Sequence, residues 1–366
     1  MGSARRRAPV PGVAAHAGAS NPPRPPLAAH ADWSVAPGKR WVALARPVLG
    51  TRREGGRDGW RVSVAPVGEV ATLLARLLRA ARGGPVAFGL DAPIGLPRAY
   101  AAHHAADYPD FPAFLRGLAA RPGFFEVCDG LHEVGPGRPF YPRRGRAGMT
   151  RLSHAWALGL PDAAALLRAC DRATTRRPAG APPFWTLGAN QSGKAALAAW
   201  RDLLLPALVA PAPALLWPFD GALLSLLRPG RVAVAETYPA EALRHLGLAP
   251  PGSKRRRADR AALAAPLRAA MARLHAAPDP ATAALIADGF GADPAGEDRL
   301  DCLLGLLCVL GVLAGHRPDG VPPGDPWLTR WEGWTLGQTD PPLAPPHPGP
   351  HETRPRVSVP GTGCGD

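Results

Sequence analysis

"PVAFGLDAPIGLP" (residues 85–97) predicts a buried strand that ends on a carboxylate and then turns sharply. Residues 85–90 are apolar or small, Asp91 follows them, and the prolines and glycine after it favour a turn. Aspartate also suits a helix N-cap or an Asx-turn, so this segment alone favours a structural role. The rest of the chain decides between the two interpretations.

The flanking sequence predicts a mixed sheet covered by helices, an α/β fold. Strands are expected over residues 27–34, 40–48, 59–67, 85–90 and 230–236. The first three follow one another closely, so they favour an antiparallel meander, and the later ones alternate with helices, which is typical of parallel pairing. Amphipathic or apolar helices are expected over 67–84 and 297–315.

The 366 residues are long enough for one large domain with a packed core. We expect that domain over about 27–337, with a large helical and loop insertion at about 98–228. Residues 1–26 and 338–366 are rich in proline, glycine and alanine without periodicity, which predicts disordered tails.

Composition restricts the partners and the compartment. The formal charge of +14 suggests nucleic acid, but nearly all of it is arginine spread over the chain, so it supports an anionic partner only weakly. No apolar run reaches the roughly 20 residues of a membrane helix, and no apolar signal-peptide core opens the chain. Five scattered cysteines without a CxxC spacing fit a reducing cytoplasm.

Five acids fall where strands end or where the last helix begins. They are Asp32, Asp91, Glu236, Asp298 and Asp301. Ligand sites of sheets with parallel strands form beyond the carboxyl ends of the strands, and neighbouring strands are about 4.8 Å apart. Crowded carboxylates repel one another unless a cation lies among them, and Mg²⁺ or Mn²⁺ suits such oxygen ligands. Each acid alone also fits a cap or an ion pair, but together they predict a metal site.

Five motifs in this order resemble a known family, the domain of unknown function family 429. They are HADWS, GLDAPIGLP, AETYPAEALRHLG, DRLDCLLGLLC and WEGWTLG, and the resemblance covers roughly 28–337. That family is described as predicted ribonuclease H-like nucleases.

The resemblance implies a ribonuclease H-like mixed sheet with acids on the first strand, on the fourth strand and on a late helix. Carried over by motif, Asp32 and Asp91 are the strand acids, and Asp298 and Asp301 are the paired helix acids. Glu236 is the strand-ending acid before a Tyr-Pro turn. We expect Asp32, Asp91, Glu236 and Asp301 to be catalytic metal ligands, with Asp298 as a supporting or alternative ligand.

One basic segment is the best candidate for contact with nucleic acid. GRPFYPRRGRAGMTR (137–151) interleaves aromatic and arginine side chains, which stack on bases and hold phosphates respectively. The predicted contact residues are Arg138, Tyr141, Arg143, Arg144 and Arg146. A solvated, arginine-rich loop is an equally good interpretation.

Two further segments receive structural interpretations. SKRRRADR (253–260) is typical of a solvated charge run before a helix. GANQSGKAA (188–196) approaches a phosphate-binding loop, but Ala195 stands where a hydroxyl would contact Mg²⁺, which favours a loop leading into a helix.

The sequence therefore predicts a cytoplasmic, Mg²⁺- or Mn²⁺-dependent nuclease acting on phosphodiester bonds of DNA or RNA. Two alternatives remain open. One is a nucleic-acid-binding protein of the same fold without turnover. The other is an actin-like ATPase or phosphotransferase, for which the glycine-rich stretch GTRREGGRDG (50–59) is a weak phosphate hairpin.

Overall fold

The computed structural model of the protein describes most of the chain between residues 27 and 343. The described ranges are 27–48, 59–145, 148–188, 192–209, 213–249 and 252–343. The predicted disordered segment 1–26 lies outside them, as does the part of 338–366 that follows Leu343. The glycine-rich stretch 50–59 also lies outside them, except for Gly59.

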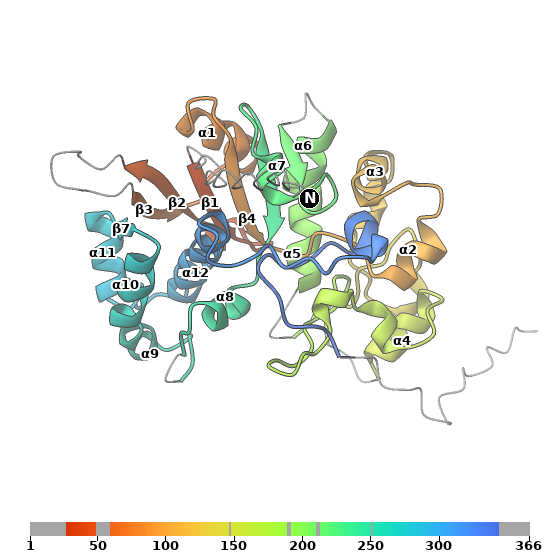
Figure 1. The fold of residues 1–366 in the computed structure, drawn as a ribbon. Helices are drawn as coiled ribbons and strands as arrows, with labels where there is room; N and C mark the ends of the chain where they lie inside the picture. The colour runs from red at the N-terminus through yellow and green to blue at the C-terminus, as the bar shows by residue number, and fades with distance from the viewer. Residues whose placement is uncertain are drawn as a thin grey trace, which may run out of the picture.

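A seven-stranded mixed sheet forms the centre of the molecule, in the order β5-β6-β4-β1-β2-β3-β7 (Figure 1). The strands are β1 Leu27–Asp32, β2 Trp41–Val48, β3 Gly59–Pro66, β4 Val86–Asp91, β5 Ala214–Leu216, β6 Val232–Glu236 and β7 Ala276–Pro278. β2 is antiparallel to β1 and to β3, whereas β4 is parallel to β1 and to β6. The predicted mixed α/β sheet, antiparallel first and parallel afterwards, is confirmed.

The sequence pattern does not predict the two strands at the edges of the sheet. β5 pairs in parallel with β6, and β7 pairs in parallel with β3, through three residues each. Three residues are too few to show an alternation of apolar and polar side chains. These edge strands form because the neighbouring strand offers free backbone groups.

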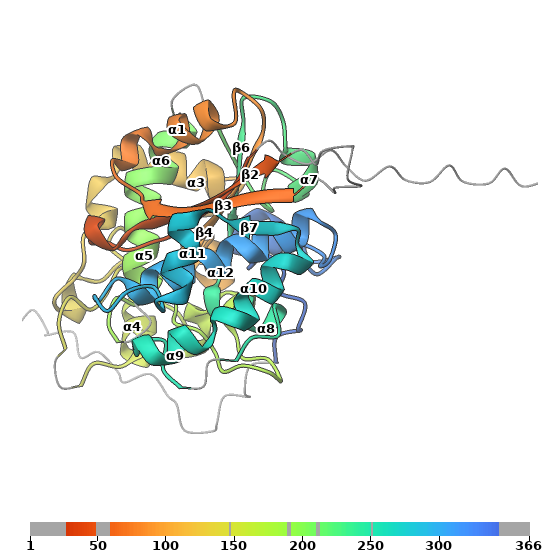
Figure 2. The same ribbon diagram turned by 90° about the vertical axis from the view of Figure 1, so that its left-hand side faces the viewer.

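Helices cover both faces of the sheet. They are α1 Leu73–Ala80, α2 Arg98–His104, α3 Phe111–Gly117, α4 Arg151–Ala157, α5 Ser192–Ala199, α6 Leu205–Val209, α7 Leu223–Leu226, α8 Pro239–His245, α9 Arg257–Ala262, α10 Ala264–Arg273, α11 Pro280–Ala287 and α12 Gly296–Leu313. In Figure 2, α1, α3 and α6 lie above the sheet and α8 to α12 lie below it. None of the helices in the described ranges combines the length and the apolar composition that a membrane crossing requires.

Alternating large and small residues along the central strands let α12 pack closely on one face of the sheet. Phe88 and Leu90 of β4 point into the core beneath α1, while Ala87 and Gly89 face α12. A Cβ atom on Gly89 would lie 2.7 Å from a side-chain carbon of α12, so only glycine fits there. Because side chains alternate along a strand, Asp91 also belongs to the α12 face.

His30 connects β1 to α12 by a hydrogen bond, two residues before the strand-ending Asp32. Its Nδ1 atom donates to the Cys302 carbonyl at 3.0 Å, and its Nε2 atom accepts from the Thr237 hydroxyl at 2.7 Å. A Cβ atom on Gly305 would lie 2.1 Å from Nε2, so α12 presents a glycine to the ring. Burial lowers the pKa of His30 to about 3, which keeps the ring neutral.

The insertion between β4 and β6 contains α2 to α7 and the edge strand β5 (Figure 1). Its aromatic side chains pack edge to face, with the ring centroids of Phe140 and Phe184 5.3 Å apart and those of Phe111 and Trp200 5.2 Å apart. The Trp200 indole donates to the Pro93 carbonyl at 2.7 Å. The core of the insertion is therefore continuous with the core of the sheet.

The chain after α12 returns across the ends of the strands. The Leu96 amide donates to the Trp331 carbonyl at 2.7 Å, and the Leu336 amide donates to the Glu236 carbonyl at 2.9 Å. Gln338 is 1% exposed, and the Leu343 amide donates to a carbonyl of the insertion at 2.7 Å. The folded part therefore extends beyond the predicted boundary at 337, because these residues close over the insertion.

Candidate functional site

Asp32 and Asp91 end adjacent parallel strands at the same level. They stand opposite each other in the register of β1 and β4, and both side chains lie on the α12 face. Burial and the charge of Asp301 raise the pKa of Asp91 to about 8, and burial and the charge of Asp91 raise the pKa of Asp32.

The first two turns of α12 bring two more acids to this pair. Burial raises the pKa of Asp298 to about 6, and its buried Oδ2 atom has no hydrogen-bond partner among the described residues. Burial also raises the pKa of Asp301, which the Lys254 ammonium opposes. The charges of Asp298 and Asp301 both act on Asp32. We call Asp32, Asp91, Asp298 and Asp301 the carboxylate cluster.

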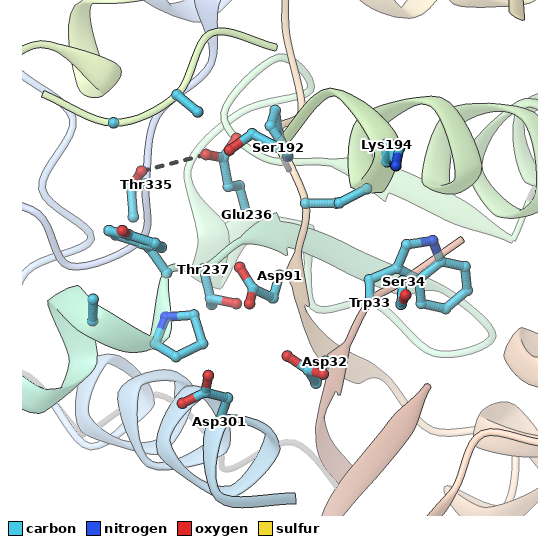
Figure 3. A pocket seen from close by; sticks show the side chains of 18 of the residues that line it. Asp32, Trp33, Ser34, Asp91, Ser192, Lys194, Glu236, Thr237, Asp301 and Thr335 are labelled. Carbon is cyan, nitrogen blue, oxygen red and sulfur yellow. Dashed lines mark hydrogen bonds between the residues drawn. The ribbon is translucent and has the colours of Figure 1, made fainter. Parts of the chain in front are cut away.

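The carboxylate cluster opens into a cavity of about 480 Å³. Figure 3 shows Asp32 on β1, Asp91 on β4 and Asp301 on α12 with their carboxyl groups directed toward a common space. The insertion contributes Lys194 to the wall, and the segment before α9 contributes Lys254. The four aspartates predicted as metal ligands therefore line one cavity.

Glu236 lines the same cavity but makes a different set of contacts. β6 pairs with β4 so that Glu236 stands opposite Leu90, one residue before Asp91. A difference of one residue turns a side chain to the other face of a sheet, so Glu236 points away from α12. It accepts from the Ile94 amide at 2.6 Å and from Arg168 at 2.6 and 2.7 Å. The structure does not bring Glu236 into the carboxylate cluster, where it was predicted as a catalytic metal ligand.

Arg168 bridges two buried carboxylates, those of Asp171 and Glu236. The Arg168 side chain is 1% exposed, and its Nε and Nη2 atoms each donate to Asp171 at 2.9 Å. Cys170, Asp171 and Glu236 present possible metal-ligand atoms within 4.8 Å of one another. However, the guanidinium already pairs with both carboxylates, and burial raises the pKa of the Cys170 thiol well above its usual value. This group therefore lacks free anionic ligands for a metal.

Lys254 is a site residue that the sequence pattern assigns to the wrong environment. It belongs to the predicted solvated charge run 253–260, yet its Nζ atom lies 2.6 Å from both carboxylate oxygens of Asp301. The sequence did contain one signal that Lys254 belongs to the site. Only three of the 43 basic residues are lysines, and all three, Lys39, Lys194 and Lys254, line this cavity.

Tyr141 does not provide the predicted platform for a nucleic-acid base. Its side chain is 2% exposed and packs against Trp185 and His154, with ring centroids 6.0 and 5.3 Å away. The neighbouring Phe140 belongs to the aromatic core of the insertion. Phe140 and Tyr141, which lie among the arginines of this segment, therefore fill the interior instead of facing a ligand.

The arginines of the same segment are only partly available to a ligand. Arg138 lies 3.0 Å from the carboxylate of Glu126, and Arg143 lies 3.4 Å from another acid of the insertion. Arg144 is exposed. Arg146 lies outside the described residues. Among the described residues, Arg144 is thus the exposed arginine of this set that pairs with no acid.

Replacing His154 with phenylalanine is expected to weaken the acid sensitivity of the fold. Burial lowers the pKa of His154 from 6.5 to about 4, and its Nε2 atom donates to the Pro139 carbonyl at 2.8 Å. The unfolded chain therefore binds a proton that the folded protein excludes, so stability is lost as the pH falls from 6.5 to 4. Over that window wild type should lose about 3 kcal/mol more than His154→Phe.

Urea denaturation at pH 7, 5 and 4 measures this difference. Parallel stability curves for the two proteins would contradict it. His103→Phe is the control, because His103 is exposed and its replacement should leave the curve unchanged.

Comparisons with known proteins return no counterpart: no family model matches the chain, and no curated protein or solved structure matches it. The resemblance to the family of unknown function stays a prediction that rests on the motifs themselves.

Proposed function

We propose that this protein hydrolyses phosphodiester bonds of nucleic acid with a divalent ion, Mg²⁺ or Mn²⁺, held by the carboxylate cluster. One observation carries the proposal. Asp32 and Asp91 are in register at the ends of parallel strands, and α12 adds Asp298 and Asp301 on the same face. Such crowding of carboxylates destabilises the folded protein unless a cation neutralises it.

A ribonuclease H-like fold is part of the proposal. The sheet is antiparallel through β1, β2 and β3 and parallel through β4 and β6. Acids end its first and fourth strands and open a late helix. This is the arrangement that the family resemblance implies, so the topology supports it.

The residues present suit a hard divalent ion. The charges that act most strongly on Asp32 are all negative, and Asp298 has a buried oxygen without a partner among the described residues. Carboxylate oxygens of this kind are the ligands that Mg²⁺ and Mn²⁺ prefer. When bound, the ion would activate a water molecule and neutralise charge on the phosphoryl group. Lys39 and Lys194 on the cavity wall would attract the anionic substrate.

A panel of labelled substrates tests the proposal. Single-stranded, duplex, hybrid and branched nucleic acids are incubated with the full chain in Mg²⁺, in Mn²⁺ or in chelator. We expect cleavage of at least one substrate with metal and none with chelator. Tight binding without cleavage would support the non-catalytic alternative, and neither binding nor cleavage would contradict the proposal.

Divalent metal is expected to stabilise the protein. Because burial and the charges of neighbouring carboxylates raise the pKa values of Asp32 and Asp91, the metal-free protein loses stability as the pH rises toward 8. A metal ion at a hundred times its Kd should add about 2.7 kcal/mol and raise the Tm by several degrees.

Thermal melts at pH 7.5 with and without Mn²⁺ measure the effect. Asp32→Asn should match or exceed the Tm of wild type without metal and should lose the metal-induced increase. A wild-type Tm that millimolar Mn²⁺ does not change would count against a metal site.

A further inference from the structure

Lys254 occupies one side of the carboxylate cluster as a fixed cation. Its Nζ atom lies 2.6 Å from both carboxylate oxygens of Asp301 and 3.9 Å from Glu297. Its side chain is only 22% exposed, and its charge also acts on Asp91. The ammonium therefore neutralises the same acids that a divalent ion at this position would neutralise.

A second buried arginine holds the Lys254 backbone in place. Arg260 is 2% exposed, and its three side-chain nitrogens donate to three carbonyl oxygens. They belong to Lys254, Gly289 and Gly291, at 2.6, 2.8 and 2.7 Å. The last two lie in the turn that leads into α12, so Arg260 joins the Lys254 segment to the helix that carries Asp301. Because Arg260 holds its backbone, Lys254 has a more restricted position than a lysine on a solvent-exposed loop.

The choice of lysine at this position is itself informative. Arginine is the basic residue almost everywhere else in the chain, since only three of 43 basic residues are lysines. An ammonium is a compact point charge that can approach one group of oxygen atoms closely. A guanidinium instead spreads its charge over a planar fork. Lys254 therefore places a compact positive charge directly against both oxygens of the Asp301 carboxylate.

We propose that Lys254 is the resident second cation of the carboxylate cluster, so that the protein binds one divalent ion where a site of this kind otherwise holds two. The inference rests on the proposed function. Asp32, Asp91 and Asp298 would hold the single ion. Lys254 and Asp301 would form the other half of the site, with Nζ available to neutralise an oxygen of an anionic substrate. Two-metal sites stabilise both oxygens of a phosphoryl displacement, and here the ammonium would act on one of them.

The number of Mn²⁺ ions bound to the full chain tests the inference without any substrate. Isothermal titration calorimetry on the metal-free protein should give one Mn²⁺ per wild-type chain. Lys254→Met removes the ammonium and frees Asp301, so it should give two. Lys254→Met/Asp301→Asn removes the ligand as well, so it should return to one. Lys194→Met is the matched control, because Lys194 lines the same cavity without contacting Asp301 among the described residues, and it should stay at one.

Each result bears on the inference. Two Mn²⁺ ions per wild-type chain would overturn it and leave the proposed function standing, because the second ion would then displace Lys254. One Mn²⁺ in both wild type and Lys254→Met would also overturn it. No bound Mn²⁺ in wild type would overturn both the inference and the proposed function. Circular dichroism checks that Lys254→Met is folded, and Lys254→Gln, which retains a polar side chain, replaces it if it is not.

Discussion

Replacing Asp91 with asparagine should lower the rate of metal-dependent cleavage by about 10³-fold. Asp91 is in register with Asp32, and its carboxyl group faces the same space as that of Asp301 (Figure 3). Asparagine keeps the size of the side chain but removes the charge that holds the ion. A metal ion supplies several kcal/mol of transition-state stabilisation, and each 1.36 kcal/mol corresponds to a factor of ten in rate.

The matched control is Asp279→Asn. Asp279 also follows a strand, β7, but its side chain caps α11 by accepting from the Thr282 amide at 2.7 Å. Asparagine caps a helix as well as aspartate does, so this variant should keep wild-type activity and stability. Initial rates on the best substrate of the panel, at saturating Mn²⁺, compare the two variants. If Asp91→Asn retains more than about a tenth of the wild-type rate, a loss of only ~1.4 kcal/mol, the carboxylate cluster is not the catalytic site.

Replacing Arg168 with methionine should lower the free energy of unfolding by about 3–5 kcal/mol. The guanidinium is fully buried and donates to Asp171, to Glu236 and to the Glu332 carbonyl. Methionine fills similar volume but leaves two carboxylates buried without a cation. The loss of stability comes from those unpaired buried charges, since a buried ion pair itself adds little net stability.

Neutralising the two acids together with the arginine separates these contributions. The triple variant Arg168→Met/Asp171→Asn/Glu236→Gln should recover most of the stability that Arg168→Met loses. Arg257→Met is a second comparison, because Arg257 and Asp288 form an ion pair in which both side chains are about half exposed. It should lose less than about 1 kcal/mol. Urea denaturation followed by circular dichroism measures all three, and a loss below about 1 kcal/mol for Arg168→Met would contradict the expectation.

The acids of the cluster were predictable because each occupies a position that local pattern reveals. Asp32 and Asp91 follow short apolar runs, and Asp298 and Asp301 open a long apolar helix at a spacing of three. Strand pairing at the usual spacing and the packing of α12 on the sheet then bring these ends together. Glu236 is the acid for which this local pattern gives the wrong position. It also ends a strand, but the register of β6 against β4 places it one residue short of Asp91, on the other face.

The partners of the charged groups were not predictable. Lys254 belongs to a run of basic residues, and nothing next to it in the sequence points to Asp301, 47 residues away. Arg168 bonds Glu236 across 68 residues. Tyr141 lies in an arginine-rich segment that looks solvent-facing, yet the fold of the insertion buries it beside Trp185.

By itself the sequence determined which residues form the central strands, which helix carries acids at its start, and that the sheet is mixed. These properties depend on apolar periodicity and on turn residues, which act over a few neighbouring positions. Only the tertiary structure decided which acids share a cavity, which of them keep a free charge, and which arginines and lysines neutralise the rest. Those outcomes depend on strand register and on long-range ion pairs. A shift of one residue reverses the face of a side chain, and burial decides whether a charge must find a partner.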